Sequence, residues 1–386
     1  MTPLRGITVV ALEQAVAAPF ATRQLADLGA RVIKVERPGV GDFARGYDET
    51  VKGMASHFVW LNRGKESIAL DLKSEEGFAA VKALAETADV FIQNLAPGAA
   101  ERLGLGADAL REINPGLIHV SISGYGAGGP YTQKKAYDLL VQCEAGLVSI
   151  TGTPDEPSKV GISIADIASG MYAYTGILTA IIERGQTGTG ATIEVAMLEA
   201  LAEWMGYPLN YAMYGGSAPD RTGARHASIY PYGPFTCGEG LVFLGLQNER
   251  EWATFCDKIL GNPDLAADPR FVRNSLRVEN ADELRAEIER VFADRTSGQV
   301  ADELEAAGIA NAMLRDMGEL ADHPQLEARN RWRTYDSPAG ELRGLIPPVT
   351  FAGTEPLMGA IPEVGEHTEA ILAELGLRSE AATAAS

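Results

Sequence analysis

The feature that most constrains the fold is a regular alternation of strand and helix patterns over residues 1–125. Residues 7–12 form a short apolar run, residues 17–30 carry a helical pattern that stops at Leu28-Gly29, and residues 31–36 form a second apolar run. Short connections between such segments are typical of the β-α-β unit of a parallel sheet. Further strand patterns follow at 67–72, 89–93 and 117–123. We therefore predict an α/β protein whose large domain is doubly wound and Rossmann-like.

The rest of the chain predicts a second domain. Residues 215–225 are rich in Gly, Ser and Pro, which favours a linker after a large domain of residues 1–214. Residues 226–317 begin with a hairpin-like pattern and continue in acidic amphipathic helices, so we expect a small α+β domain there. One long apolar helix is expected over residues 197–214, directly before the linker.

The charge of the chain limits its partners. A net charge of −19 argues against nucleic acid and against an anionic membrane surface as electrostatic partners. The charge is uneven, with a net of −2 over residues 1–150 and −17 over residues 151–386. The cations that a polyanionic ligand would need are therefore in the first part of the chain.

The sequence favours a cytoplasmic location. It has no run of eighteen apolar residues, and its first residues lack the layout of a signal peptide. The three cysteines, Cys143, Cys237 and Cys256, have neither metal nor redox spacing, which suits a reducing compartment. We expect no metal site and no membrane partner.

One carboxyl group stands out in the centre of the chain. Asp166 is the only ionisable carboxyl between Val160 and Ile182, and its neighbours are small or apolar. The segment that follows is predicted to be a largely buried helix ending at Arg184-Gly185. Such a carboxyl group is either satisfied locally, as a helix cap or buried hydrogen-bond acceptor, or used in chemistry. The segment alone leaves both possibilities open.

Polar residues follow the predicted strands. A doubly wound sheet binds its ligands at the carboxyl ends of its strands, so the loops after these strands should cluster. They carry several cations and an amide: Arg37, Lys73, Asn94, Arg102, Lys134 and Lys135. Any single one could be an ordinary solvated strand end, but together they suit a phosphorylated ligand. The Gly-rich loop at residues 124–129 is followed by Pro130 rather than by a helix, so we interpret it as a turn and not as a dinucleotide site.

Several motifs resemble the class III CoA-transferases, a family that includes formyl-CoA and carnitine CoA-transferases and is related to α-methylacyl-CoA racemases. These motifs are residues 3–9, 28–42, 62–73, 88–94, 137–138 and 365–368. The resemblance covers almost the whole chain. It implies a large Rossmann-like domain to which residues 318–386 return, a small domain, and an interlocked, ring-like homodimer.

The resemblance also implies roles for individual residues. Asp166 matches the family's catalytic aspartate. The positions that match contacts with coenzyme A are Val16, Ala17, Arg37, Leu70, Lys73, Asn94, Leu95, Arg102, Lys135, Tyr137 and Asp138. Val16 and Ala17 would approach the thioester end. Coenzyme A would act as a substrate, and no permanently bound cofactor is expected.

The resemblance implies CoA transfer from an acyl-CoA to a free carboxylic acid through aspartyl anhydride and aspartyl-CoA thioester intermediates. A glutamine and a tyrosine near the active site of formyl-CoA transferase are replaced by Val16 and His57, which disfavours formate or oxalate chemistry. Succinyl-CoA with a dicarboxylic acceptor is favoured instead. Candidate residues for such a substrate are Arg45, His57, Arg225 and His226.

Two alternatives stay open. A racemase would share Asp166 but needs a second acid or base, and the histidine that racemases use for this is replaced by Tyr137. A phenol with a pKa near 10 is a poor substitute, so the transferase is favoured. A non-catalytic protein that binds CoA ligands would keep the cations but would not require Asp166.

Overall fold

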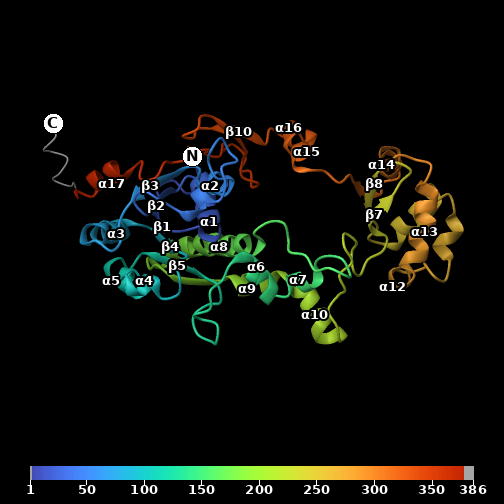
Figure 1. Ribbon diagram of the computed structural model, residues 1–386, viewed down its shortest axis with the longest axis horizontal. Helices are drawn as coiled ribbons and strands as arrows, with labels where there is room; N and C mark the ends of the chain where they lie inside the picture. The colour runs from blue at the N-terminus through green and yellow to red at the C-terminus, as the bar shows by residue number, and fades with distance from the viewer. Residues whose placement is uncertain (1, 378–386) are drawn as a thin grey trace. The chain divides into compact units, whose positions relative to one another are not determined.

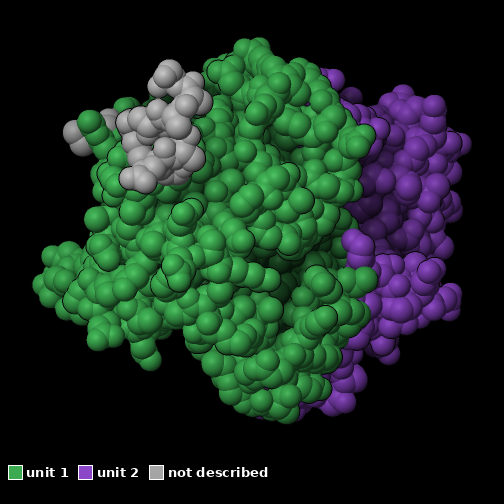
Figure 2. All heavy atoms as spheres, turned by 60° about the vertical axis from the view of Figure 1, so that its left-hand side comes forward, with its two compact units in different colours: residues 1–145, 160–206, 328–386 green, residues 146–159, 207–327 purple. Residues whose placement is uncertain are grey.

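The computed structural model describes residues 2–377, which form two compact units (Figure 2). Unit 1 takes its described residues from 1–145, 160–206 and 328–386, and unit 2 consists of 146–159 and 207–327. These bounds differ from the domains expected from the sequence, because residues 207–214 and 146–159 both belong to unit 2. The tail after Leu377 lies outside the described residues.

Unit 1 is built around a six-stranded sheet (Figure 1). Its helices and strands are β1 (Thr8–Leu12), α1 (Ala17–Asp27), β2 (Arg31–Glu36), η1 (Phe43–Gly46), α2 (Ser56–Asn62), β3 (Lys65–Ala69), α3 (Glu75–Thr87), β4 (Val90–Gln93), α4 (Ala99–Arg102), α5 (Ala107–Ile113), β5 (Ile118–Ser123), α6 (Asp138–Glu144), α8 (Ile164–Thr187), β6 (Thr192–Ala196), α9 (Met197–Trp204), β10 (Trp332–Tyr335), β11 (Leu342–Leu345) and α17 (Thr368–Glu374).

The six strands are all parallel and lie in the order β3-β2-β1-β4-β5-β6. Val9 on β1 lies opposite Val32 on β2 and Val90 on β4. The chain therefore builds the sheet outward from β1 in one direction, then returns to continue from β4 in the other. In such sheets, ligands bind where the direction changes, at the carboxyl ends of the strands.

Helices cover both faces of this sheet. Val10 on β1 belongs to a buried apolar cluster with Val81 of α3, Leu110 of α5 and Ile371 of α17. Since side chains alternate along a strand, Val9 points to the opposite face. That face carries α1 and α8, which pack along each other.

The C-terminal part of unit 1 covers the edge of the sheet. His367 donates its backbone N–H to the Ser67 carbonyl oxygen at 2.9 Å, and Ala69 donates to the Thr368 hydroxyl at 2.9 Å. Ser67 and Ala69 belong to β3, whereas His367 and Thr368 are at the start of α17. The exposed edge of β3 is thereby occupied by the returning chain.

Unit 2 combines a small sheet with helices. Its elements are α7 (Leu147–Ile150), α10 (Gly206–Gly215, which begins at the unit boundary), β7 (Tyr232–Thr236), β8 (Leu241–Gly245), α11 (Glu249–Lys258), η2 (Pro263–Ala267), α12 (Asn274–Glu279), α13 (Ala281–Phe292), α14 (Ser297–Ala306), β9 (Ala310–Ala312), α15 (Met317–Ala321) and α16 (Pro324–Ala328, which ends at the boundary). The strands form an antiparallel sheet, β7-β8-β9. Phe235, Trp252 and Phe292 lie in its fully buried core.

The expected single helix over residues 197–214 is wrong. The structure has two helices, α9 and α10, with the break at Met205. Pro208 explains the break, because proline lacks an N–H and its ring clashes with the carbonyl four residues earlier. Proline is tolerated only in the first turn of a helix, which is where Pro208 lies in α10.

Among residues 2–377, α8 is the one helix long and apolar enough to cross a membrane by length and composition. Of its most apolar 18-residue stretch, 39% is buried, and the helix packs against α1, β5 and β6. Its exposed residues recur every three or four positions along one side: Tyr172, Thr175, Thr179 and Ile182. We refer to these four as the exposed stripe of α8.

Helix α8 approaches α1 closely at Gly170. A Cβ atom at this position would lie 2.6 Å from the carbonyl oxygen of Ala17 and 3.0 Å from Cδ1 of Phe20. These separations are shorter than van der Waals contact, so only glycine fits without movement of the neighbouring backbone. The N-terminal part of α1 and the second turn of α8 are therefore held against each other.

This contact predicts opposite effects for two glycines of the same helix. Gly170→Ala should lower the free energy of unfolding by about 1–3 kcal/mol, because the added methyl group overpacks the α1 contact. Gly185→Ala should raise it by about 0.5–1 kcal/mol, because no atom of the described residues lies within 4 Å of its Cβ position and alanine favours a helix. Urea denaturation of both variants tests this; equal shifts in one direction would contradict the close approach.

Candidate active site

The loops that follow the strands of unit 1 meet at one edge of the sheet. Because the strands are parallel, the residues after β1, β2, β3, β4 and β5 all lie at their carboxyl ends. Helix α8 leads into β6, so its N-terminus lies at this edge too. Asp166 is in the first turn of α8 and therefore shares the edge with the predicted coenzyme A contacts.

The loops after β1 and β4 are tied together at the point where the sheet changes direction. The Asn94 side chain accepts a hydrogen bond from the Gln14 N–H at 2.8 Å and donates one to the Gln14 carbonyl at 2.9 Å. Val16 caps α1 and is buried, as is Ala17. Three of the predicted residues, Val16, Ala17 and Asn94, thus belong to one ordered junction.

The carboxyl group of Asp166 is half-buried, and its pKa is strongly perturbed. Burial raises the pKa to about 7, and the negative charge of Asp138 adds to the rise. Gly170 lies one turn further along α8 and packs on Ala17. Asp166 therefore lies one turn from the contact between α8 and the start of α1, and its carboxyl group titrates near neutral pH.

Asp138 holds the N-terminus of α8 from outside that helix. Its Oδ1 accepts hydrogen bonds from the N–H groups of Ala165 at 2.8 Å and Asp166 at 3.4 Å. Its Oδ2 accepts from Gln142 Nε2 at 2.6 Å. A carboxylate at a helix N-terminus satisfies free N–H groups and complements the helix dipole. The sequence implied a contact with coenzyme A for Asp138; the described structure gives it this capping role.

Tyr47 is a residue that the sequence analysis missed. Its pKa is raised to about 12 by burial, and then by the charges of Asp42 and Asp166 and by Tyr137. The ring centroids of Tyr47 and His57 are 5.5 Å apart in an edge contact. The phenol group of Tyr47 is therefore close enough to interact with both Asp166 and Tyr137. Tyr47 lies in the long irregular segment after β2, where no periodicity marks a buried or functional position.

The predicted cations remain available at the edge. Arg37, Lys73 and Lys135 are exposed, and none has an ion-pair partner among the described residues. Arg102 contacts the Pro97 carbonyl at 3.4 Å. Lys134 instead pairs with Glu144 and lies 4.2 Å from the Tyr131 ring centroid.

The two leucines predicted to contact coenzyme A, Leu70 and Leu95, lie in the loops after β3 and β4. Leu70 is buried directly after β3 and donates its N–H to the Glu36 carbonyl at 2.9 Å. Leu95 follows β4 and donates its N–H to Gln93 Oε1 at 2.8 Å.

No group of three or more His, Cys, Asp or Glu residues is arranged as metal ligands within residues 2–377.

Two of the predicted substrate residues of unit 1 differ in their availability. Arg45 donates to both carboxylate oxygens of Glu36, at 2.9 and 2.8 Å, and to the Pro362 carbonyl at 3.1 Å. Its guanidinium also lies 3.7 Å from the Phe58 ring centroid, so Arg45 serves the fold. His57 has a buried Nδ1 without a hydrogen-bond partner among the described residues.

The other two predicted substrate residues lie in unit 2. Arg225 and His226 line a cavity of about 340 Å³ with Tyr230 and Asn280. Arg225 is 3.7 Å from the Asp282 carboxylate. The His226 ring is stacked on Tyr232, with centroids 5.3 Å apart.

Known structures share this mixed α/β fold with its parallel central sheet. A crystal structure of a CAIB/BAIF family protein from Brucella suis is 34% identical to this chain. The match has a TM-score of 0.84 and covers 97% of this chain and 99% of that one.

Sequence comparison gives the family. The model of CoA-transferase family III matches residues 4–368. An acetyl-CoA:oxalate CoA-transferase from Acetobacter aceti is 38% identical, over 85% of each chain. A succinate–glutarate CoA-transferase from Agrobacterium fabrum is 35% identical, over 99% of this chain and 98% of that one. The protein belongs to CoA-transferase family III.

The raised pKa of Asp166 predicts a pH-dependent effect on stability. The folded state favours the protonated acid, so this group costs the folded state stability as the pH rises from about 4 to about 7. Asp166→Asn removes that cost. Its free energy of unfolding should therefore exceed that of the wild type by up to about 4 kcal/mol at pH 8, and by less at pH 5. Urea denaturation at both pH values measures this; an equal difference at both would contradict the shifted pKa.

Proposed function

We propose that this CoA-transferase moves coenzyme A from an acyl-CoA to a dicarboxylic acid, with Asp166 as the nucleophile. The observation that carries the proposal is a carboxyl group with a pKa of about 7, in the first turn of α8 at the edge of the sheet where Arg37, Lys73 and Lys135 lie exposed. At that pKa, a large part of the Asp166 population is ionised at neutral pH. Partial burial keeps the carboxylate poorly solvated, which favours nucleophilic attack.

The proposed reaction has two symmetric halves. An Asp166 oxygen attacks the acyl carbonyl carbon of the donor, the carbon–sulfur bond breaks, and a mixed anhydride and CoA thiolate form. The thiolate then attacks the aspartyl carbonyl and releases the donor acid, which leaves an aspartyl-CoA thioester. The acceptor carboxylate reverses these two steps and regenerates the Asp166 carboxylate. No proton is consumed overall.

The cations of the edge support binding of the nucleotide part of coenzyme A. Arg37, Lys73 and Lys135 are exposed and follow different strands, and ammonium and guanidinium groups bind phosphate by charge-assisted hydrogen bonds. Arg102 lies in α4, after β4, at the same edge. We infer that these residues hold the phosphates while Val16 and Ala17 approach the thioester.

A dicarboxylic acceptor is supported by the relatives. The matched protein from Agrobacterium fabrum is named for succinate and glutarate, which are both dicarboxylic acids. The one from Acetobacter aceti is named for oxalate, also a dicarboxylic acid, although Val16 and His57 disfavour oxalate itself here. We propose His57, whose Nδ1 has no hydrogen-bond partner within residues 2–377, as a residue that contacts the acid, and we retain Arg225 and His226 as candidates. Arg45 is not proposed for this role, because Glu36 and Pro362 occupy its donors.

A racemase is disfavoured by the residue beside Asp138. The position that would carry the second acid or base holds Tyr137, which is exposed at the start of α6. A phenol is a weak proton acceptor at neutral pH.

We also propose a Rossmann-like classification of unit 1 and a homodimer in the cytoplasm. The strand order of the sheet supports the first. The exposed stripe of α8 and the exposed Leu139 and Leu140 of α6 support burial against a second copy. Three free cysteines are consistent with a reducing compartment.

The role of Asp166 is tested by its amide. Asp166→Asn should lower transfer between an acyl-CoA and glutarate by about 10³-fold or more, because the amide is not a nucleophile. Mass spectrometry of the newly formed acyl-CoA measures transfer. Glu183→Gln, an exposed carboxyl on the same helix, is the matched control and should transfer like the wild type. Wild-type transfer by Asp166→Asn would refute the mechanism.

The role of Arg37 is tested by binding. Arg37→Ala should raise the Kd for coenzyme A about tenfold or more, because one charge-assisted contact to phosphate is lost. Isothermal titration calorimetry measures the Kd. Lys82→Ala removes an exposed cation from α3 and should leave the Kd unchanged. An unaltered Kd for Arg37→Ala would remove Arg37 from the site.

A further inference from the structure

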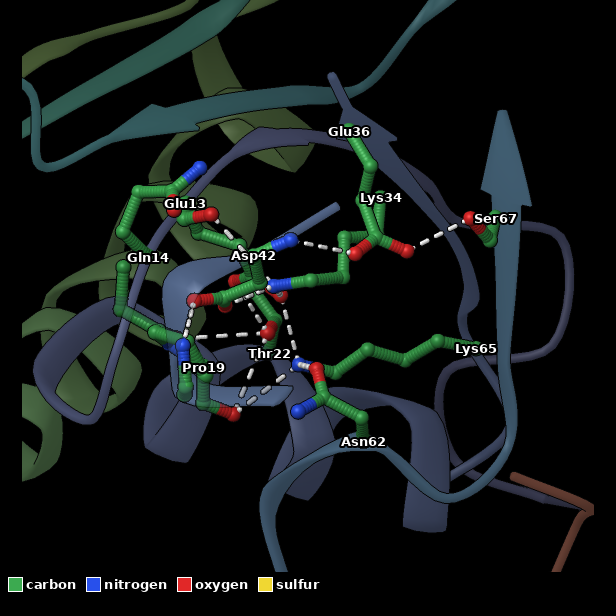
Figure 3. Close-up of polar contacts among 12 residues, drawn as sticks. Glu13, Gln14, Pro19, Thr22, Lys34, Glu36, Asp42, Asn62, Lys65 and Ser67 are labelled. Carbon is green, nitrogen blue, oxygen red and sulfur yellow. Dashed lines mark hydrogen bonds and ion pairs between the residues drawn. The ribbon is translucent and has the colours of Figure 1, made fainter. Parts of the chain in front are cut away.

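Four charged side chains are buried together on the face of the unit 1 sheet that carries α1 (Figure 3). They are Glu13 after β1, Lys34 on β2, Lys65 on β3 and Asp42 in the segment after β2, and we call them the ionic cluster. Their ion pairs are Lys34–Asp42 at 2.8 Å, Lys34–Glu13 at 3.3 Å and Lys65–Glu13 at 2.6 Å. All four side chains are 0% exposed.

The donors of the ionic cluster are all used within it or beside it. Lys65 Nζ reaches three acceptors, Glu13 Oε1, the Pro19 carbonyl and Asn62 Oδ1, at 2.6, 3.2 and 3.0 Å. The second Glu13 oxygen accepts from the Thr22 hydroxyl at 2.6 Å. A lysine ammonium has three donor protons, so Lys65 is fully satisfied.

One oxygen of the ionic cluster contacts backbone at the candidate site. Asp42 Oδ2 is bound to Lys34, while Asp42 Oδ1 accepts hydrogen bonds from the N–H groups of Ala15 at 3.1 Å and Ala44 at 2.9 Å. Ala15 directly precedes Val16 and Ala17. The Lys34–Asp42 pair is therefore linked by one hydrogen bond to the loop that would approach the thioester.

Ala15 needs such a link, because its backbone is strained. Its φ of 59° lies in the left-handed region, which disfavours residues with a Cβ atom. The loop is held at two successive residues: Asn94 binds Gln14, and Asp42 binds Ala15. Strained conformations of this kind persist where surrounding contacts over-determine them, and they gather at functional sites.

Stability alone does not account for the ionic cluster. Buried ion pairs can often be replaced by apolar residues without loss of stability, because desolvation of the charges offsets their attraction. What apolar residues could not do is accept the Ala15 N–H. The contribution specific to these charges is therefore the conformation of the loop.

We propose that the Lys34–Asp42 pair is a positioning unit, which acts through the Ala15 N–H to set the distance between the thioester and Asp166. Ala17 packs on Gly170 of α8, one turn from Asp166, so a shift at Ala15 changes the alignment of the two reacting groups. Such misalignment affects the chemical step far more than binding. This inference rests on the proposed function, because it assumes that acyl transfer occurs on Asp166.

The test is Asp42→Asn in the full-length protein, with acyl-CoA and glutarate as substrates. The amide has one accepting oxygen instead of two, so it cannot accept from both Lys34 and the Ala15 N–H, and the hold on Ala15 should loosen. We expect kcat to fall about 10²-fold. The Kd for coenzyme A should stay unchanged, because no predicted phosphate contact is altered.

Two further variants separate positioning from general damage. Adding Ala15→Gly to Asp42→Asn should raise kcat about tenfold above that of Asp42→Asn alone, because glycine adopts a positive φ without strain. Asn114→Ala removes two hydrogen bonds away from Asp42, to the carbonyl oxygens of Ala85 and Ala88 at 3.0 and 2.9 Å, and should lower the Tm but not kcat. Recovery of kcat by a glycine is a result that a merely structural role would not produce.

The outcomes are decisive. Wild-type kcat in folded Asp42→Asn, or no recovery by Ala15→Gly, would overturn the positioning role. If Asp42→Asn does not fold, Ala15→Val is tested in its place. A β-branched residue resists the positive φ, while the ionic cluster stays intact. Wild-type kcat in Ala15→Val would also overturn the positioning role. Full transfer by Asp166→Asn in the same assay would instead overturn the proposed function.

Discussion

The candidate site depends on the burial of opposite charges against the central sheet. Lys34 and Lys65 stand on neighbouring strands where apolar residues would usually lie, and each is neutralised by carboxylates that come from loops. A buried charge cannot leave its partner without a large desolvation cost, so the loops that supply Glu13 and Asp42 have little freedom. The sheet thus determines the paths of the segments after β1 and β2. The segment after β1 carries Val16 and Ala17, which are implied to approach the thioester. The segment after β2 carries Arg37, the first of the proposed phosphate contacts.

A second constraint acts through α8. This helix leads into β6, so its N-terminus points to the ligand edge, and Gly170 brings it against α1. Asp138 then has two effects on Asp166. It caps the N-terminus of α8 through hydrogen bonds, and its charge helps to keep the neighbouring carboxyl group protonated below neutral pH. Position and reactivity of Asp166 are therefore both linked to the short helix α6, which begins at Asp138.

The sequence predicted the alternation of strands and helices in unit 1 well, because apolar periodicity and glycine stops are local signals. It failed where tertiary contacts decide. The strand expected at 67–72 is observed at Lys65–Ala69, since a lysine gives no apolar signal, although Lys65 is buried by its pairing with Glu13. For the candidate site, the resemblance pointed to Asp166 and the cations, whereas Tyr47 and the capping by Asp138 depend on contacts across the fold. Arg45 was expected near the substrate because a guanidinium suits a carboxylate, and the carboxylate it binds is Glu36.

The return of the chain to β3 has a consequence for synthesis on the ribosome. The six strands are complete once residue 196 has emerged, yet Ile371 and the segment around His367 still have to arrive from beyond unit 2. During translation of some 170 residues, the outer strand keeps free backbone groups and an unfinished apolar face, which are features that promote mispairing between nascent chains. Most of unit 2 is thus an insertion whose translation time sets how long that strand stays unprotected.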